Sequence, residues 1–329
     1  MNVKKKNPVI TFFTSREGIL AIFVVIFFAV LASTSNLGSD MFSFLKDVSY
    51  MIVGGLALML VIMLGEIDIS SGTVLGLIGF FTGNLLKMGV PIPVVVIVAM
   101  LVGTVNSAVI GFINVKFKVP SMVVSLAMVK LHIGIFPLLP NAGWVSNIPT
   151  EITDIGNTRI FGMIPAILIF SLIILVFFIW FMKYTRFGKK IYAVGGSKDS
   201  ATLAGINTNK VVFRTFLMSG ALLGITSMMY WLPASQVQPS GTNGLEMYFI
   251  PIAVVSGVSI LGGTGRPIGI LISAVLIAML QRACILWGLG NSWLYLTYGV
   301  VVLIAVYSSV TEFSSIFGKK MKANKGGAE

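Results

Sequence analysis

The strongest chemical candidates lie in one short polar stretch within apolar sequence, Gly65-Glu66-Ile67-Asp68-Ile69-Ser70-Ser71-Gly72. Ionisable groups inside membrane-spanning sequence are costly and are therefore functional candidates by default. Two carboxylates and two hydroxyls between glycines indicate a broken or re-entrant element rather than a plain turn. We interpret Asp68 and Ser70 as candidates for the lining of a solute pathway or its gate. The alternative is that Asp68 or Ser70 caps the helix that follows, and both roles can hold together.

Further polar residues interrupt other apolar segments. Lys130 and His132 are two positions apart and cannot share one helix face, so at least one of them faces the protein interior or water. Packing, or a lysine that snorkels to the inner surface, is the alternative to a pathway role. Asn106 and Asn114 are eight positions apart and fall on nearly one face, which favours hydrogen bonds between helices. The predicted pathway or gate residues are Asp68, Ser70, Asn106, Lys130, His132 and Gln281.

The same inventory argues against catalysis and metal binding by this chain. Cys284 is the single cysteine and His132 the single histidine, which excludes an internal disulfide and a cysteine metal cluster and makes a Ser-His-Asp triad unexpected. The glycine-rich run over 262–267 lacks the lysine and hydroxyl pair of a Walker A loop. We therefore predict no catalytic site, no metal and no cofactor on this chain.

The amino-acid composition indicates that these residues lie in a protein surrounded by lipid. Of 329 residues, 56% are hydrophobic and 10% are charged, against about 25% charged in ordinary soluble domains. A lipid-facing surface removes the need for surface charge, and 35 glycines suit close helix packing. The net charge of +12 falls in short clusters between apolar segments, which argues against a nucleic-acid surface.

Hydropathy predicts an all-α bundle of about ten membrane spans, because a span needs roughly 20 mainly apolar residues. The whole chain, 1–329, is expected to form a single transmembrane domain with a short tail at about 311–329. The expected spans are 18–36, 48–65, 71–87, 93–114, 121–139, 161–182, 213–232, 247–262, 268–288 and 292–310.

The distribution of positive charge predicts the orientation of these spans. With the N-terminus inside, 18 of the 23 Lys and Arg residues lie in inner segments and three in outer ones. The positive-inside rule therefore places both termini in the cytoplasm and requires an even number of spans. As an alternative, the first span is a cleaved signal peptide, because three lysines over 4–6 precede an apolar stretch.

The largest piece between spans is the inner segment at about 183–214. Gly195-Gly196 reads as a turn that leads into a short helix, with Ser197 or Asp199 near its cap. No part of the chain outside the spans is large enough to fold alone. Any chemistry that needs a nucleotide must therefore come from another chain.

Four segments carry a resemblance to a known family. Residues 65–72 resemble the segment G-x-I-D-[IL]-S-x-G of the permease subunits in the ribose, xylose, arabinose, galactose and autoinducer-2 branch of bacterial ABC importers. Residues 118–126 (KVPSMVVSL) resemble that family's K-[VI]-P-x-F-I-V-T-L. Tyr192 to Ile206 is similar to its Y-A-x-G-G-N-x-x-A-A-x-L-S-G-I loop, with Ser197 in place of the usual Asn, and Gly262-Gly263-Thr264-Gly265 with Gly269 is similar to its glycine-rich turn.

The resemblance covers nearly the whole chain in order and implies a transport role. It implies import of a monosaccharide or related sugar-like solute across the bacterial inner membrane. The implied partners are an ATP-binding subunit that holds ATP and Mg, a second permease that is identical or a sister chain, and an extracytoplasmic solute-binding protein. The residues implied to couple to the ATPase are Gly195, Gly196, Ala201, Leu203, Gly205 and Ile206.

A stand-alone transporter driven by protons or sodium is the alternative function. Such a transporter usually carries several acids within its spans, and only Glu66, Asp68 and Glu246 qualify here.

Overall fold

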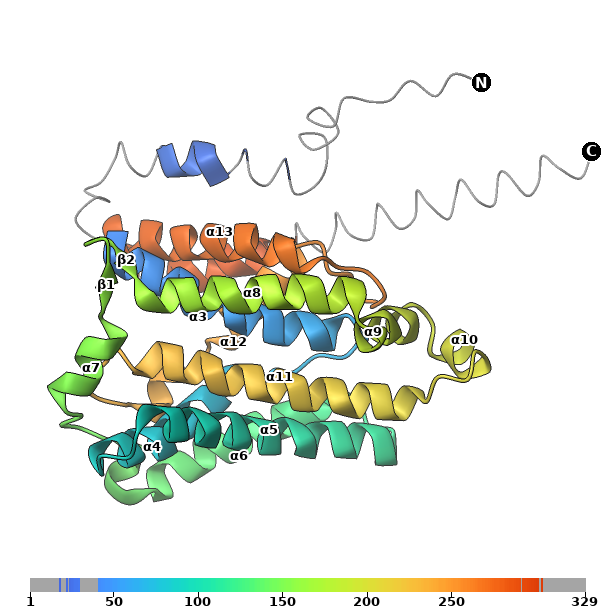
Figure 1. Ribbon diagram of the computed structural model, residues 1–329, viewed down its shortest axis with the longest axis horizontal. Coiled ribbons are helices and arrows are strands. Elements are labelled where there is room, and N and C mark those ends of the chain that lie inside the picture. Colours follow the sequence, from blue (N-terminus) through green and yellow to red (C-terminus); the bar gives the residue numbers. More distant parts are fainter. Residues whose placement is uncertain are drawn as a thin grey trace, which may run out of the picture.

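The computed structural model describes residues 18, 22, 24–29, 41–290, 292–301 and 303. Within these ranges the protein is a bundle of helices with long axes roughly side by side (Figure 1). The larger helices are α3 (Met41–Ile62), α4 (Ser71–Lys87), α5 (Ile92–Phe117), α6 (Ser121–Ile135), α8 (Ala166–Tyr184), α11 (Thr208–Trp231), α12 (Glu246–Val255) and α13 (Pro267–Leu286). Residues 292–301 are also helical.

Short elements connect the larger helices at both ends of the bundle. At one end they are η2 (Phe136–Leu138), η3 (Pro140–Gly143), α7 (Thr150–Gly156), the strands β1 (Arg159–Ile160) and β2 (Ile164–Pro165), and η4 (Pro239–Thr242). The two strands pair antiparallel as a small hairpin. At the other end lie α9 (Arg186–Gly196) and α10 (Lys198–Leu203), which extend beyond the bundle in Figure 1.

Proline marks where several helices begin. Pro91, Pro120 and Pro165 stand at the N-cap positions of α5, α6 and α8, and Pro267 is the first residue of α13. Proline fits the start of a helix because its missing N–H would have no intrahelical partner there. These residues therefore set the entry points of the apolar segments.

Six of the described helices are long and apolar enough to cross a membrane by length and composition. This identifies an integral membrane protein, while ten spans with cytoplasmic termini stay a prediction. The six candidates are Met41–Ile62, Ile92–Phe117, Ser121–Leu138, Ala166–Tyr184, Thr208–Trp231 and Pro267–Leu286. The expected spans 18–36 and 292–310, the possible signal peptide and the tail at 311–329 lie partly or wholly outside the described residues.

Several expected boundaries differ from the structure for identifiable reasons. The helix expected at 161–182 begins at Ala166, because Phe161 and Gly162 have positive φ and form the β1–β2 turn. The helix expected at 247–262 ends at Val255, before a loop in which Gly257, Gly262 and Gly263 have positive φ. The expected helix at 71–87 agrees with α4.

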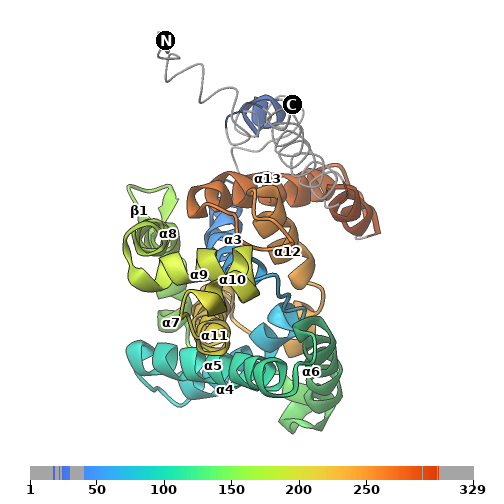
Figure 2. The same ribbon diagram turned by 90° about the vertical axis from the view of Figure 1, so that its right-hand side faces the viewer.

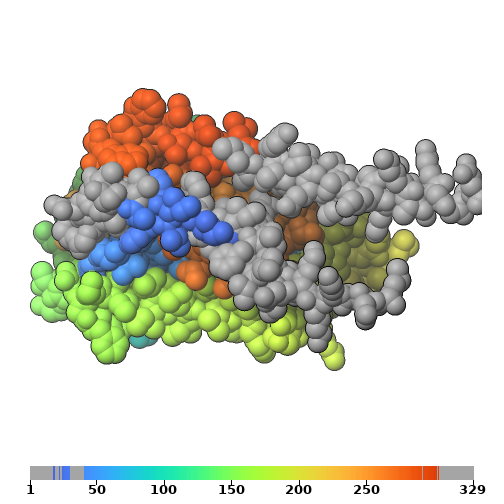
Figure 3. All heavy atoms as spheres, turned by 90° about the horizontal axis from the view of Figure 1, so that it is seen from above, coloured from blue at the N-terminus to red at the C-terminus, as the bar shows by residue number. Residues whose placement is uncertain are grey.

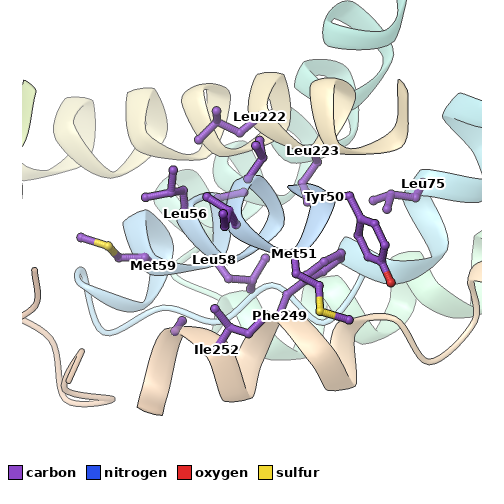
Figure 4. Packing of buried hydrophobic residues seen from close by; sticks show 14 of the residues in the cluster. Tyr50, Met51, Leu56, Leu58, Met59, Leu75, Leu222, Leu223, Phe249 and Ile252 are labelled. Atoms are coloured by element: carbon purple, nitrogen blue, oxygen red, sulfur yellow. The ribbon is translucent and has the colours of Figure 1, made fainter. Parts of the chain in front are cut away.

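Helix α3 is the centre of the bundle. Every residue from Val48 to Ile62 is buried, and Figure 2 shows α3 enclosed by α8, α12 and α13, with α11 packed against it on another side. The close view in Figure 4 shows its side chains between those of α11 and α12. The labelled residues include Tyr50, Met51 and Leu58 of α3, Leu222 and Leu223 of α11, and Phe249 and Ile252 of α12.

The peripheral helices show the opposite pattern. In α6 and α8 only 28% of the apolar window is buried, and large apolar side chains such as Ile173, Val176 and Phe177 of α8 are exposed. Figure 3 shows the face with α8 along one edge and α13 along the other. Such faces suit contact with lipid.

Glycines let α5 and α11 approach closely. A methyl group added at Gly103 would contact the backbone oxygen of Gly220, and one added at Gly224 would contact Ala99. Small residues at helix crossings are the usual means of tight packing in membranes. This contact holds α5, which carries both asparagines singled out in the sequence, in a fixed position.

Candidate functional site

The polar stretch expected from the sequence is a break between α3 and α4. Helix α3 ends at Ile62, Gly65 adopts φ 73, and the chain stays non-helical through Asp68 before α4 begins. The structure therefore confirms a broken element. Its backbone is held by α6, because the Ile67 and Ile69 N–H groups donate to the Oγ atoms of Ser121 and Ser125 at 3.0 and 3.1 Å.

Glu66 joins three other elements at this break. Its Oε2 accepts hydrogen bonds from Ser121 Oγ of α6 at 2.7 Å and from Asn114 Nδ2 of α5 at 3.1 Å. Its Oε1 forms an ion pair with Lys198 Nζ of α10 at 2.7 Å. The Glu66 carboxylate is 10% exposed and the Lys198 side chain 51% exposed. A buried carboxylate with charge-assisted partners on three helices fixes the break relative to all of them.

A polar cleft of about 520 Å³ opens beside this ion pair. It lies at the α10 end of the bundle, between the break and the start of α11. Lys118 stands at its edge in a left-handed conformation (φ 59) and donates to Asn209 Oδ1 at 3.2 Å. The cleft is lined by Gly65, Glu66, Asn114, Val115, Lys118, Pro120, Lys198, Asp199, Thr202, Thr208, Asn209 and Val212.

Asp68 is fully buried and uses only one of its carboxylate oxygens. Its Oδ1 accepts from the backbone N–H of Ser70 at 2.9 Å and from Ser70 Oγ at 2.7 Å, while Oδ2 has no hydrogen-bond partner. Ser70 occupies the N-cap position of α4 but makes no side-chain cap bond. Asp68 therefore shapes the turn before α4 instead of capping its first-turn amides, and one carboxylate oxygen remains for another ligand.

Two other predicted residues meet Asp68 near the start of α4. Asn106 Nδ2 of α5 donates to Ser70 Oγ at 3.2 Å, and Asn106 Oδ1 is buried without a partner. His132 of α6 is 1% exposed, and its Nδ1 lies 2.9 Å from Thr73 Oγ1 of α4. The interhelical hydrogen bond expected for Asn106 is thus confirmed at the N-cap of α4, whereas Asn114 bonds to Glu66 in the break and to Val119 O and not to another helix.

The structure does not bring Lys130 or Gln281 to this cluster. Lys130 is exposed on α6 while His132 is buried, as their two-residue spacing requires. Gln281 belongs to α13 and lines a different cavity, together with Tyr230 and Tyr248. The pathway roles of the six predicted residues stay predictions.

The predicted coupling segment forms two helices joined at Ser197. Ser197 caps α10 by accepting from the Ser200 N–H at 3.2 Å, which confirms the expected cap, and Asp199 lies in the first turn. The expected glycine turn is wrong, because Gly195 and Gly196 form the end of α9 and neither has positive φ. Gly205 does have positive φ (77).

The apolar residues implied to couple to the ATPase differ in their exposure. Ala201 is 4% exposed and packs into the protein, whereas Leu203 is 91% exposed. Ile206 is half-buried. Ala201 and Leu203 therefore do not form one exposed face, because residues two positions apart on a helix point to nearly opposite sides.

Backbone contacts without intervening side chains join α9 to the end of α3. A methyl group added at Gly195 would collide with the Met63 backbone oxygen and lie 2.6 Å from Gly263 N. The Gly263 N–H donates to the same Met63 oxygen at 2.9 Å, and Tyr192 Oη of α9 donates to Gly265 O at 2.7 Å. The segment thus rests on both the break and the glycine-rich loop at 262–265.

The described residues contain no group of three or more His, Cys, Asp or Glu side chains that could hold a metal ion. The site instead combines a polar break, unused hydrogen-bonding groups and an ion pair to a half-exposed lysine of α10. Sequence reasoning missed Lys198 and Ser121 as partners of Glu66. A basic residue in the inner segment was visible, but nothing in the sequence connects positions 66 and 198.

Comparison with known proteins gives consistent matches along the chain. Residues 40–306 match the family described as branched-chain amino acid transport system / permease component. The chain is 30% identical over 273 residues to the ribose import permease protein of Escherichia coli strain K12, covering 82% of this chain and 84% of that protein. No solved structure matches.

Two further relatives are similar over comparable lengths. The ribose import permease protein of Haemophilus influenzae is 30% identical over 288 residues, covering 84% of this chain and 88% of the relative. The autoinducer 2 import system permease protein of Yersinia pseudotuberculosis is 28% identical over 295 residues, covering 88% and 83%.

We expect Ser121→Ala to destabilise the fold more than Ser171→Ala. Ser121 accepts from the break and donates to Glu66, whereas the equally buried Ser171 bonds only to Leu168 O of its own helix. Loss of Ser121 leaves the part-buried Ile67 N–H without its partner, and the cost approaches the roughly 1–3 kcal/mol of a buried unpaired donor only as far as water is excluded. Thermal unfolding of the purified protein in detergent measures the difference, and equal midpoints for the two variants would contradict it.

Proposed function

The chain belongs to the branched-chain amino acid transport system / permease component family, and from this premise we propose that it is the permease of an ATP-driven importer for a monosaccharide or related sugar-like solute. Membership makes the chain a permease component rather than an enzyme. The solute class is supported by the relatives that import ribose and autoinducer 2. The alternative, an ion-coupled secondary transporter, is not favoured by these matches.

The proposal assigns energy conversion to other chains. A separate ATP-binding subunit would hold ATP and Mg, a second permease copy or sister chain would complete the pathway, and an extracytoplasmic protein would deliver the solute. The bacterial relatives support a location in the bacterial inner membrane. The whole chain would act as one transmembrane domain, and it would bind no cofactor itself.

The proposed coupling to the ATP-binding subunit rests on the contact of α9 and α10 with the break. A polyol cannot cross hydrocarbon with unsatisfied hydroxyls, so its pathway must open and close around it. Lys198 of α10 binds Glu66, and Gly195 of α9 touches Met63. A partner that displaces α9 and α10 would therefore act directly on the polar break, beside which Asp68, Asn106 and His132 lie.

We assign different roles to Leu203, Gly195 and Gly196 on this surface. Leu203 is free of the bundle and is available to a partner, while Gly195 transmits the displacement through its backbone contact. Ala201, Gly205 and Ile206 would support the shape of the segment. Gly196 has no neighbour within 4 Å of an added methyl group.

We expect ten spans with cytoplasmic termini, and thus opposite exposure of the two ends of the bundle. In a Cys284→Ser background, Ser240→Cys should react with a membrane-impermeant thiol reagent in intact cells, and Ser200→Cys should react only after permeabilisation. Both positions are exposed in the structure, so burial does not explain a lack of labelling. Labelling of Ser200→Cys from outside would overturn this topology.

We expect Asp68→Asn to reduce solute uptake more than it reduces the amount of assembled protein. An amide oxygen can still accept from Ser70, but the charge and the second carboxylate oxygen are lost. A charge-assisted bond exceeds a neutral one by about 1 kcal/mol, equal to about fivefold in uptake. Uptake per assembled permease measures the effect. Asp154→Asn, at an exposed position, is the control, and a parallel loss of protein and uptake in Asp68→Asn would leave Asp68 with a structural role only.

We expect Gly195→Ala to uncouple the importer while Gly196→Ala leaves it active. The added methyl group at 195 must displace Met63 or the loop at Gly263, whereas at 196 it meets no neighbour. A shift of about 1–3 kcal/mol in coupling corresponds to about 5- to 150-fold. Solute-stimulated ATP hydrolysis and uptake by the reconstituted complex are the measurements, with co-purification of the ATP-binding subunit as a check on assembly. Unchanged stimulation in Gly195→Ala would refute the coupling assignment.

A further inference from the structure

A second polar cavity, of about 240 Å³, lies near the opposite end of α3 from the break. It shares no lining residue with the cleft beside Glu66. Asp47 and Tyr50 come from the first turns of α3, Tyr230 from the end of α11, and Gln281 from the last turns of α13. The remaining lining residues are Gly241, Asn243, Gly244, Leu245, Tyr248, Leu294 and Tyr295.

The cavity has a buried floor and an open side. Tyr50, Leu245 and Leu294 are 4%, 6% and 7% exposed and form the floor. Asn243 and Tyr295 are exposed and stand at the open side. A small molecule could therefore enter from one direction and become largely enclosed. The volume lies just below the range of about 300–1,000 Å³ typical for drug-sized ligands.

Apart from the Asp47 carboxylate, which only accepts, the polar side chains of the lining both donate and accept hydrogen bonds. Tyr50, Tyr230 and Tyr248 contribute phenol hydroxyls, and Asn243 and Gln281 contribute amides. The Gln281 Oε1 atom is buried and has no hydrogen-bond partner. Because buried polar atoms are normally paired, this acceptor is an unused binding group beside the cavity.

Aromatic rings hold this lining in place. The Tyr50 and Tyr230 rings lie edge to face, with centroids 5.1 Å apart and planes at 88°, and Tyr50 also meets Phe249 edge to face at 6.4 Å. Tyr248 packs edge to face on Tyr298 at 5.1 Å. Rings fixed in this way present apolar faces and polar tips at defined positions.

The charges at the cavity offset each other. Asp47 is the charged residue in its lining, and its Oδ2 lies 4.0 Å from Arg282 Nη2. A charged ligand would meet either the carboxylate or a cation already paired with it. A neutral ligand with several hydroxyls would meet a matching set of donors and acceptors and aromatic faces for its C–H surface.

We propose that this cavity binds one neutral, polyhydroxylated ring molecule of monosaccharide size within a single protomer. It would be the first site on this chain that binds the solute, before the solute reaches the polar break. This inference deepens the proposed import function and rests on it for its biological role. The binding itself depends only on the residues of this chain.

An adjoining cavity has a different lining, and the comparison shows which ligand each of the two cavities suits. A larger space of about 610 Å³ lies on the other side of Gly244 and Tyr295, which line both. Its remaining lining residues are Glu246, Met247, Ile250, Pro251, Tyr298, Gly299 and Leu303. That lining is mainly apolar and offers few groups to a polyol, so the two spaces differ in the ligand that they suit.

The test uses the purified full-length chain in detergent, with a reporter at the open side of the cavity. Gly241→Cys in the Cys284→Ser background carries the chain's one thiol at an exposed lining position where an added Cβ atom meets only ordinary contacts, and its modification rate is measured with a small thiol reagent. D-ribose, D-xylose and D-galactose are the probes, and maltose is the size control. We expect at least one monosaccharide to slow modification and maltose not to do so.

Two substitutions connect the protection to the named groups. Gln281→Leu removes an acceptor that bonds to nothing in the protein, so it should not lower the unfolding temperature. Tyr248→Phe keeps the ring and removes the hydroxyl. Each should weaken protection by about two- to tenfold, the effect of one hydrogen bond. Tyr184→Phe, which removes an exposed hydroxyl far along α8, should leave protection unchanged.

The outcomes separate this inference from the proposed function. Absence of protection by all three monosaccharides, or equal protection in the reporter protein with and without Gln281→Leu or Tyr248→Phe, would overturn the cavity assignment even if the reconstituted complex imports sugar. Protection that weakens in both variants would support the assignment even if ATP-driven import failed, in which case the proposed function would be the part in error.

Discussion

The structure depends on one constraint, the need to satisfy backbone polar groups where the chain stops being helical within the bundle. The chain between α3 and α4 is not helical, and a backbone polar group that is buried without a partner costs free energy comparable to a lost hydrogen bond. Ser121 and Ser125 of α6 supply acceptors for Ile67 and Ile69. Because the break is held by side chains of another helix, α6 is bound to α3 and α4, and a polar surface becomes possible inside an apolar bundle.

The break also determines how the surface helices reach the interior. Helix α3 is buried from Val48 to Ile62, so a displacement at its end would act on the helices that pack around it. Gly195 and Gly263 reach the Met63 carbonyl directly, with no side chain between them. Contacts made by backbone alone leave no rotamer free to absorb a displacement. Gly195, which the sequence suggested as part of a turn, therefore serves here as a place of close approach.

The sequence predicted the parts of the site that depend on local pattern. A polar stretch within apolar sequence identified the break, and a serine before a short segment identified the cap of α10. It could not predict that Glu66 and Lys198 pair, because 132 positions separate them and either charge alone reads as part of a polar turn or a basic loop. It also placed Gln281 with Asp68, because both are polar residues in apolar segments. Only the packing of α13 against α3 and α12 assigns Gln281 to the tyrosine-lined cavity.

The two contacts between α9–α10 and the break differ in how easily they can be broken. Lys198 is half-exposed, so its separation from Glu66 returns the ammonium to water, and exposed pairs contribute only about 0–1 kcal/mol. Glu66 would keep its hydrogen bonds from Ser121 and Asn114 after that separation, which avoids the large cost of an unpaired buried charge. The Gly195 contact has no such substitute partner, because steric fit and not charge defines it. A partner acting on α9 and α10 could therefore open and re-form the Lys198–Glu66 ion pair at low cost. The contact of Gly195 with Met63 would instead have to move together with α3.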